Sequence, residues 1–227
     1  MRFDFSGERI LAVVAHPDDA ELLCVGTLAR ALDDQATVGI CAMCRGDKGV
    51  AAEGSNTDLA NIRQAELTAA AKLLGAELFF GGIDDGDLAD TPAQRHTLLS
   101  IYRRFRPTLV ITHNENDYHA DHRATFALAE ASSWFACSVG HSTSEPPLAT
   151  PPALWLMDNI GMHDFTPGFY VDISDHLQLK LDMLACHNSQ LHRSDEPGFD
   201  PLDQLMLRQA TMRGAQAGVK AAEAYRP

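Results

Sequence analysis

The stretch RILAVVAHPDDAELL (residues 9–23) joins an apolar run to a cluster of polar side chains. Residues 10–15 are all apolar, which is typical of a parallel strand that is buried on both faces. His16, Asp18, Asp19 and Glu21 follow directly, where such a strand ends. Carboxylates this close repel one another, so the sequence predicts that a cationic group lies beside them.

The rest of the chain alternates between strand and helix patterns. Apolar runs predict strands over residues 9–16, 36–44, 76–82 and 107–113, and helical spacing predicts helices over residues 19–33, 58–75, 91–105 and 120–136. Two further strands are expected at 153–158 and 168–174, and two helices near 174–190 and 201–216. This alternation is typical of βαβ units. We therefore predict an α/β fold, a Rossmann-like three-layer α/β/α sandwich with a mostly parallel sheet, formed by residues 1–227 as a single domain.

Composition and charge exclude several classes of protein. A net charge of −13 and a pI near 5.0 argue against a nucleic-acid partner and against binding to anionic membranes. The chain contains no apolar run of about 18 residues that could span a membrane, and its first residues lack the apolar core of a signal peptide. We therefore expect a cytoplasmic protein whose five cysteines are reduced thiols.

Polar segments follow each of the first four predicted strands. The carboxyl ends of parallel strands lie at one edge of a sheet, so residues 16–21, 44–49, 84–87 and 113–122 should share one rim. Two histidines and a carboxylate are a common ligand set for catalytic zinc, which keeps a further position open for water. The candidates on this rim are His16, Asp19, His113, His119, Asp121 and His122. Iron(II) or cobalt could occupy the same kind of site.

The motif AHPDDAEL (residues 15–22), followed by HADH (119–122), resembles the LmbE-like, or PIG-L, family of zinc-dependent N-deacetylases. Further segments that resemble the family are CRGDKG (44–49), RQAELTAAAKLLG (63–75), DDGDL (84–88), KLDMLACHNSQ (180–190) and RGAQAGVKAAEAY (213–225). Members of the family act on N-acetylglucosaminyl compounds. One departure is Ala120, where relatives commonly have proline.

The resemblance assigns a role to individual residues. It implies that His16, Asp19 and His122 bind the metal, that Asp18 is the general base, and that His119, in its protonated form, stabilises the oxyanion. It also implies that substrate contacts come from the residues that match the family around the rim, which are Arg45, Arg63, Asp85 and Asp121.

The function implied is removal of the acetyl group from an N-acetylglucosamine-type substrate, a sugar conjugate or a chitooligosaccharide, by a zinc-activated water. Family members often form oligomers, so the resemblance is compatible with a homo-oligomer of this chain. Hydrolysis of an amide in a thiol–sugar conjugate is the main alternative. A Rossmann-like small-molecule binding module is a second, although no G-x-G-x-x-G follows the first strand. A thiol oxidoreductase acting through Cys41 and Cys44 would leave the His/Asp rim unexplained.

Overall fold

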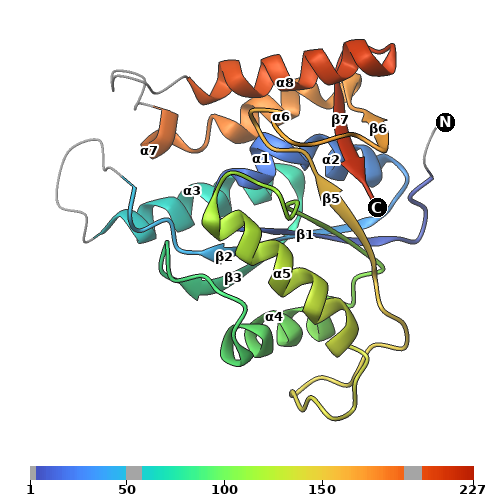
Figure 1. Cartoon of the computed structure of the whole chain (residues 1–227). Helices are drawn as coiled ribbons and strands as arrows, with labels where there is room; N and C mark the ends of the chain where they lie inside the picture. Colours follow the sequence, from blue (N-terminus) through green and yellow to red (C-terminus); the bar gives the residue numbers. More distant parts are fainter. Residues whose placement is uncertain (1–3, 50–57, 192–200) are drawn as a thin grey trace.

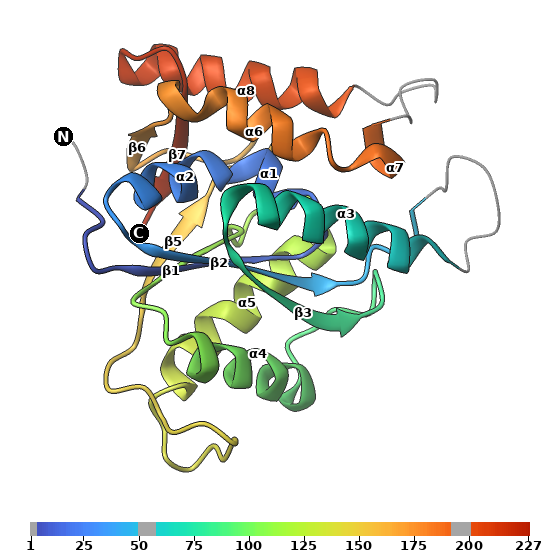
Figure 2. The ribbon, with the colours of Figure 1, turned by 180° about the vertical axis from the view of Figure 1, so that it is seen from behind.

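A computed structural model of the chain describes residues 4–49, 58–191 and 201–227. In these ranges one seven-stranded sheet lies between two layers of helices, which confirms the three-layer α/β/α arrangement (Figures 1 and 2). The strand order is β3-β2-β1-β4-β5-β7-β6. The strands are β1 (Arg9–Val14), β2 (Thr37–Cys44), β3 (Glu77–Ile83), β4 (Leu109–Thr112), β5 (Ala153–Met157), β6 (Phe169–Asp172) and β7 (Ala222–Arg226).

The helices cover both faces of the sheet (Figures 1 and 2). One layer contains α1 (Asp19–Leu23), α2 (Val25–Asp33), α3 (Leu59–Leu74), α6 (Leu177–Leu184) and α8 (Leu202–Ala217). The other contains α4 (Pro92–Phe105) and α5 (Ala120–Phe135). A 3₁₀ turn, η2 (Ser174–His176), leads into α6, and the short α7 (Asn188–Leu191) follows it.

Strand β1 lies at the centre of the sheet and supplies both halves of the core. Ile10, Ala12 and Val14 pack into the apolar cluster formed with α2, α3, α6 and α8. Leu11 and Val13 face the opposite way, into the cluster formed with α4 and α5. All five are completely buried, which explains why this strand has a continuous apolar sequence and no polar alternation.

The strand order reverses beside β1, and this reversal creates a crevice. β1 pairs in parallel with β2 on one side and with β4 on the other. After β1 the chain continues to β2 on one side, and after β4 it continues to β5 on the other side. The loops that follow β1 and β4 therefore separate at the carboxyl ends of these strands. Ligands of open α/β sheets bind at such a point. The two histidine-containing segments predicted to share a rim follow these two strands.

Local sequence signals fix several helix ends as expected. The Thr91 hydroxyl accepts a hydrogen bond from the Gln94 amide, with Pro92 as the first residue of α4. α3 ends at Gly75, whose φ of 79° is a left-handed conformation that glycine adopts readily.

One expectation about the elements was wrong, and one strand was not expected. The helix expected over residues 19–33 is divided at Cys24, whose φ of −143° is not helical. Strand β7 was not predicted, because Glu223 interrupts its apolar pattern. The Glu223 carboxylate is buried, where it accepts hydrogen bonds from the Gly26 and Thr27 amides of α2 and lies 2.5 Å from Lys180 Nζ. These partners are distant in sequence, so local pattern does not reveal them.

Two expectations from composition can be compared with the structure. Within the described ranges, no helix is both long enough and apolar enough to cross a bilayer. All five cysteines are free. Cys41 and Cys44 are completely or almost completely buried, and burial raises the pKa of each thiol, that of Cys41 to about 12. Neither is suited to thiol exchange at the surface.

Candidate metal centre

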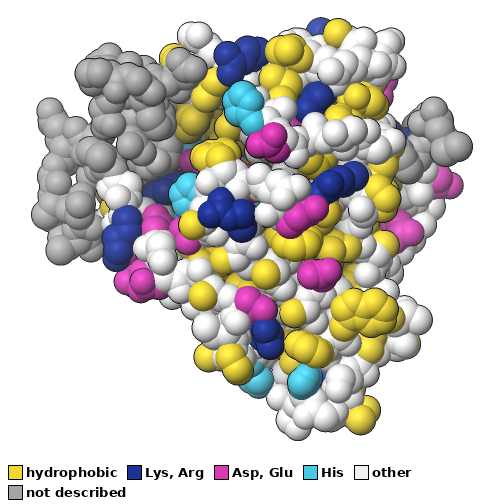
Figure 3. All heavy atoms as spheres, in the orientation of Figure 1, with side chains coloured by type: hydrophobic (Ala, Val, Ile, Leu, Met, Phe, Trp, Pro, Cys, Tyr) yellow, Lys and Arg dark blue, Asp and Glu magenta, His cyan; other side chains and the backbone are white. Residues whose placement is uncertain are grey.

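A cleft of about 550 Å³ opens at the carboxyl ends of β1 and β4. Its walls come from the turn between β1 and α1, from residues 48–49 and 85–86, from residues 118–122, and from Gln190 and Leu202. All four predicted rim segments therefore contribute to it. In Figure 3, acidic, basic and histidine side chains gather near the start of α5.

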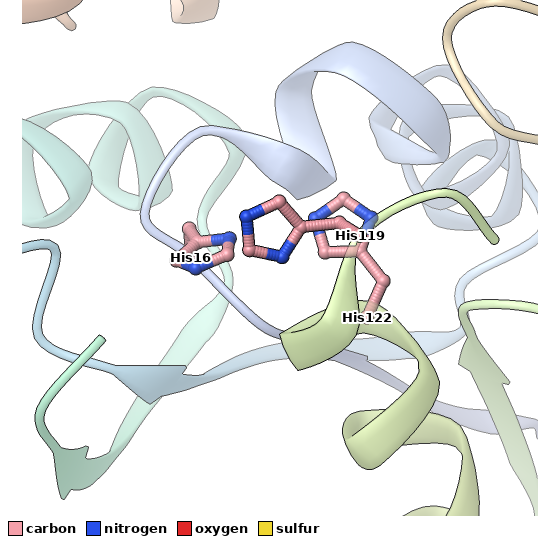
Figure 4. A group of neighbouring side chains, drawn as sticks. All are labelled: His16, His119 and His122. Atoms are coloured by element: carbon pink, nitrogen blue, oxygen red, sulfur yellow. The ribbon is translucent and has the colours of Figure 1, made fainter. Parts of the chain in front are cut away.

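Asp19 lies between two of the histidines. Its Oδ2 is 3.5 Å from His16 Nδ1, and its Oδ1 is 3.3 Å from His122 Nε2. His16 follows β1, whereas His119 and His122 come from the start of α5 and reach toward it (Figure 4). The structure thus brings together the three residues expected to bind a metal, from segments about a hundred positions apart.

A carboxylate holds the remaining ring nitrogen of each of these two histidines. His16 Nε2 is 3.1 Å from Asp121 Oδ2, and His122 Nδ1 is 3.0 Å from Asp117 Oδ1. Metal-binding histidines almost always have such a partner, which fixes the orientation and tautomer of the ring. His16 is therefore poised to use Nδ1 toward Asp19, and His122 to use Nε2.

The charges of the cleft favour an added cation. The exposed fractions of Asp18, Asp19, Asp117 and Asp121 are only 8%, 5%, 2% and 2%. Buried negative charge requires nearby positive charge. Burial by itself lowers the pKa of both histidines, but the hydrogen bonds and charges of their carboxylate partners outweigh it. They raise the pKa to about 10 for His16 and about 9 for His122.

The donor set therefore fits a divalent metal ion. Two imidazole nitrogens and a carboxylate converge, and the same carboxylates that favour protons on the histidines would favour a dication in their place. Within the described residues, three sets of side chains have ligand atoms that lie within 4.8 Å of one another: His16 with His119 and His122, His16 with Cys44 and Asp121, and Asp19 with His113 and His122.

His113 was a candidate on the rim to which the resemblance gave no role, and the structure places it against His122. It is completely buried and stacks on His122, with ring centroids 3.9 Å apart. Burial and the neighbouring His122 lower its pKa to about 4, so it is neutral. Its Nε2 accepts a hydrogen bond from the Ala15 amide at 3.1 Å, which commits the lone pair that a metal would need. His113 thus supports the ring of His122.

Asp18 has an unusual backbone conformation. Its φ of 119° is uncommon for any residue other than glycine, and outliers of this kind concentrate at functional sites. This conformation lies in the turn between β1 and α1. It directs the Asp18 carboxylate to Arg63, 3.1 Å away, whereas the carboxylate of Asp19 faces the histidines. Burial raises the pKa of Asp18, although Arg63 opposes the shift.

Arg63 reaches this position because Gly46 leaves space for it. A Cβ at position 46 would lie 2.6 Å from Arg63 Cδ, and Gly46 has a φ of 72°. The buried guanidinium also donates to the Pro17 carbonyl oxygen. The Arg45-Gly46 segment therefore packs closely against the Arg63 side chain of α3, with no room for a larger residue at position 46. Arg63 lines the cleft, as expected.

His119 is the N-cap of α5. Its Nδ1 accepts a hydrogen bond from the Asp121 amide at 3.1 Å. Burial and the nearby His122 and His16 lower its pKa, which favours the neutral ring and not the protonated one we expected. A neutral ring whose Nδ1 accepts a hydrogen bond carries its proton on Nε2. His119 can therefore act as a donor without a positive charge.

The remaining predicted site residues differ in placement. Arg45 is exposed and pairs with Asp84 at 2.9 Å, and it is not among the residues that line the cleft. Asp85 lines the cleft, but its two oxygens accept hydrogen bonds from the Gly46 and Lys48 amides. Asp121 is engaged by His16 and by the Gly86 amide.

Sequence reasoning missed several residues of the site. Asp117, which holds His122, lies five positions before it in a loop and forms no recognisable motif with it. Tyr118, Lys48 and Gln190 also line the cleft. For Tyr118, the only signal was its position next to His119.

Comparisons with known proteins agree with this arrangement. The family PIG-L, described as GlcNAc-PI de-N-acetylase, matches residues 11–133. The chain is 29% identical to the 1D-myo-inositol 2-acetamido-2-deoxy-alpha-D-glucopyranoside deacetylase of Mycobacterium sp. (strain KMS), over 81% of this chain and 74% of the relative. It is 26% identical to the solved structure of N,N'-diacetylchitobiose deacetylase from Pyrococcus horikoshii, with a TM-score of 0.83 over 98% of this chain and 85% of that one.

One relative has a different chemistry. The chain is 25% identical to the 4-oxalmesaconate hydratase of Pseudomonas putida (strain KT2440), over 91% of this chain and 80% of the relative. The same fold therefore supports more than one reaction of water.

The carboxylate behind His16 can be tested through metal affinity. We expect Asp121→Ala to weaken metal binding by about 10- to 100-fold, because His16 would lose the partner that orients its ring. Competition with a chelator of known affinity measures the change. Asp87→Ala removes an exposed carboxylate nearby and should leave the affinity unchanged. Equal affinities for wild type and Asp121→Ala would contradict the assignment.

Proposed function

The chain belongs to the PIG-L family of de-N-acetylases, and on this premise we propose that it is a metal-dependent hydrolase that removes the acetyl group from an N-acetylglucosamine-type substrate. The observation that carries the proposal is that the Asp19 carboxylate lies within 3.5 Å of a ring nitrogen of His16 and of His122, in a cleft that Asp18 and His119 also line. Cleavage of an amide requires a nucleophile, a proton acceptor and a donor to the oxyanion, and this cleft contains groups suited to each task.

His16, Asp19 and His122 would hold the metal, and zinc suits this set of nitrogen and oxygen donors, as do iron(II) and cobalt. A dication held there would polarise the amide carbonyl and lower the pKa of a water molecule.

Asp18 is placed to accept the proton of the attacking water. It adjoins the ligand Asp19, and its own carboxylate points to Arg63. Burial raises the pKa of Asp18, and a higher pKa makes a carboxylate a better proton acceptor. Arg63 limits this shift and keeps the carboxylate in one orientation. After attack, Asp18 can return the proton to the leaving amine.

His119 is placed to donate a hydrogen bond to the developing oxyanion. Its Nδ1 is occupied by the Asp121 amide, so the Nε2 proton is available to the cleft that the ring lines. Preorganised donors of this kind stabilise the charge that develops in the transition state.

We further propose that residues 1–227 act as one deacetylase domain on a small amino-sugar substrate. The protein would act in the cytoplasm, without a nucleic-acid or membrane partner. Assembly into a homo-oligomer is compatible with this activity. The net charge of −13 supports the absence of a nucleic-acid partner.

An assay over a panel of acetylated compounds tests the function. The metal-loaded protein should release acetate from N-acetylglucosaminyl-inositol, from diacetylchitobiose or from an N-acetylglucosaminyl thiol conjugate. Hydration of an unsaturated oxo acid such as 4-oxalmesaconate is the second candidate, favoured by the similarity to the hydratase. Activity on that acid and none on any amide would overturn the deacetylase assignment.

Substitution of the two neighbouring aspartates should separate chemistry from metal binding. We expect Asp18→Asn to retain about one metal ion per chain while kcat falls by roughly 10²–10⁴, the range for loss of a general base. Asp19→Ala should lose the metal itself. Metal analysis and the acetate assay measure both effects, with Asp164→Asn as an exposed control outside the cleft. Metal loss in Asp18→Asn equal to that in Asp19→Ala would refute the division.

The role of His119 requires two variants, because its side chain also caps α5. His119→Asn can keep the cap, whereas His119→Ala removes it at a cost of about 1 kcal/mol in unfolding free energy. His119→Ala should lower kcat by roughly 10²–10³ with little change in KM and metal content, as expected for one lost oxyanion donor. His119→Asn, whose side-chain N–H can still donate, should lose less activity. An unchanged kcat in folded His119→Ala would rule out the donor role.

A further inference from the structure

We propose that Tyr118 forms an aromatic platform on which the pyranose ring of the substrate stacks. The inference rests on the proposed function and extends it to the side chain that recognises the sugar. Tyr118 immediately precedes His119 and lines the same cleft as the candidate metal ligands. It has no place in the chemistry described above.

The ring of Tyr118 is open to solvent although it stands beside buried groups. Its exposed fraction is 64%, whereas that of the neighbouring His122 is 5%. The phenol plane makes an angle of 87° with the ring of His119 and 65° with that of His122, at centroid distances of 6.1 and 5.7 Å. The ring therefore stacks on neither histidine, and its face remains available to a ligand.

Most of the other residues that line the cleft are polar or charged. Its lining includes Asp18, Lys48, Arg63 and Asp85. Two leucines also line it: Leu22 is only 7% exposed, and Leu202 is partly buried. Tyr118 thus supplies a large accessible apolar surface to a cleft rich in hydrogen-bonding groups.

This combination matches the chemistry of a pyranose. Hydroxyl and acetamido groups project from the edge of the sugar, where charged and polar side chains can bind them. The C–H groups form an apolar face, which an aromatic ring can cover. Because Tyr118 adjoins His119 in the chain, a sugar stacked on Tyr118 lies next to the candidate oxyanion donor, where its acetamido group must be.

An exposed aromatic side chain by itself does not indicate a site, and the chain provides a comparison. Trp134, near the end of α5, is 68% exposed and does not line this cleft. Single exposed apolar residues of that kind are normal. What distinguishes Tyr118 is its position in the wall of the cleft, so Trp134→Ala is the matched control for its removal.

The test compares Tyr118→Ala, Tyr118→Leu, Tyr118→Phe and Trp134→Ala, each loaded with zinc and checked for metal content. We expect KM for an N-acetylglucosaminyl substrate to rise by about 5- to 20-fold in the Ala and Leu variants, with kcat within about twofold. Tyr118→Phe keeps the aromatic face and should retain the wild-type KM, as should Trp134→Ala. N-acetylethanolamine, an acetamide without a sugar ring, should be hydrolysed equally by all variants.

The contrary outcomes are distinct. An unchanged KM in Tyr118→Ala overturns the platform, as does an equal loss on N-acetylethanolamine, which would place the effect on the reacting groups. A Phe variant as impaired as the Ala variant would assign the effect to the hydroxyl and overturn stacking. In each case an active wild type leaves the proposed function intact. A folded, zinc-loaded wild type that is inactive on every acetylated sugar overturns both proposals.

Discussion

The concentration of carboxylates at the reversal of strand order is the constraint on which the site depends. Asp18, Asp19, Asp117 and Asp121 are nearly buried within one small region. Such an arrangement is stable only if positive charge lies among them. Arg63 supplies part of it at Asp18, and His16 and His122 can supply the rest as imidazolium or as ligands of a cation. The geometry that satisfies the charge is also the geometry of a metal centre.

The fold provides the rigid support for this arrangement. β1 is buried on both faces and pairs with β2 and β4, so the ends of these strands are fixed relative to each other. Asp121 then links the segments that follow β1, β3 and β4, through His16 and the Gly86 amide. The candidate site residues thus rest on secondary structure and on a second layer of hydrogen bonds.

Much of this could be predicted from sequence, because the signals were local. Apolar runs located six of the seven strands of the described sheet, and the motifs around His16 and His122 indicated the site. The strand around Glu223 could not be predicted, since its charge is compensated by Lys180, 43 residues away. The roles of Asp117 and Asp121 were hidden for the same reason: their partners are defined by the fold. The neutral state favoured for His119 also depends on burial, which sequence does not reveal.

The central claim is that the charge of this cleft is balanced by one divalent metal ion between His16, Asp19 and His122. Anomalous diffraction at the zinc edge, from crystals of zinc-loaded protein, tests it most directly. The account predicts a single peak bonded to His16 Nδ1, His122 Nε2 and the Asp19 carboxylate at about 2.0–2.2 Å. A peak bonded instead to Cys44 and Asp121, or no peak within the cleft, would contradict it.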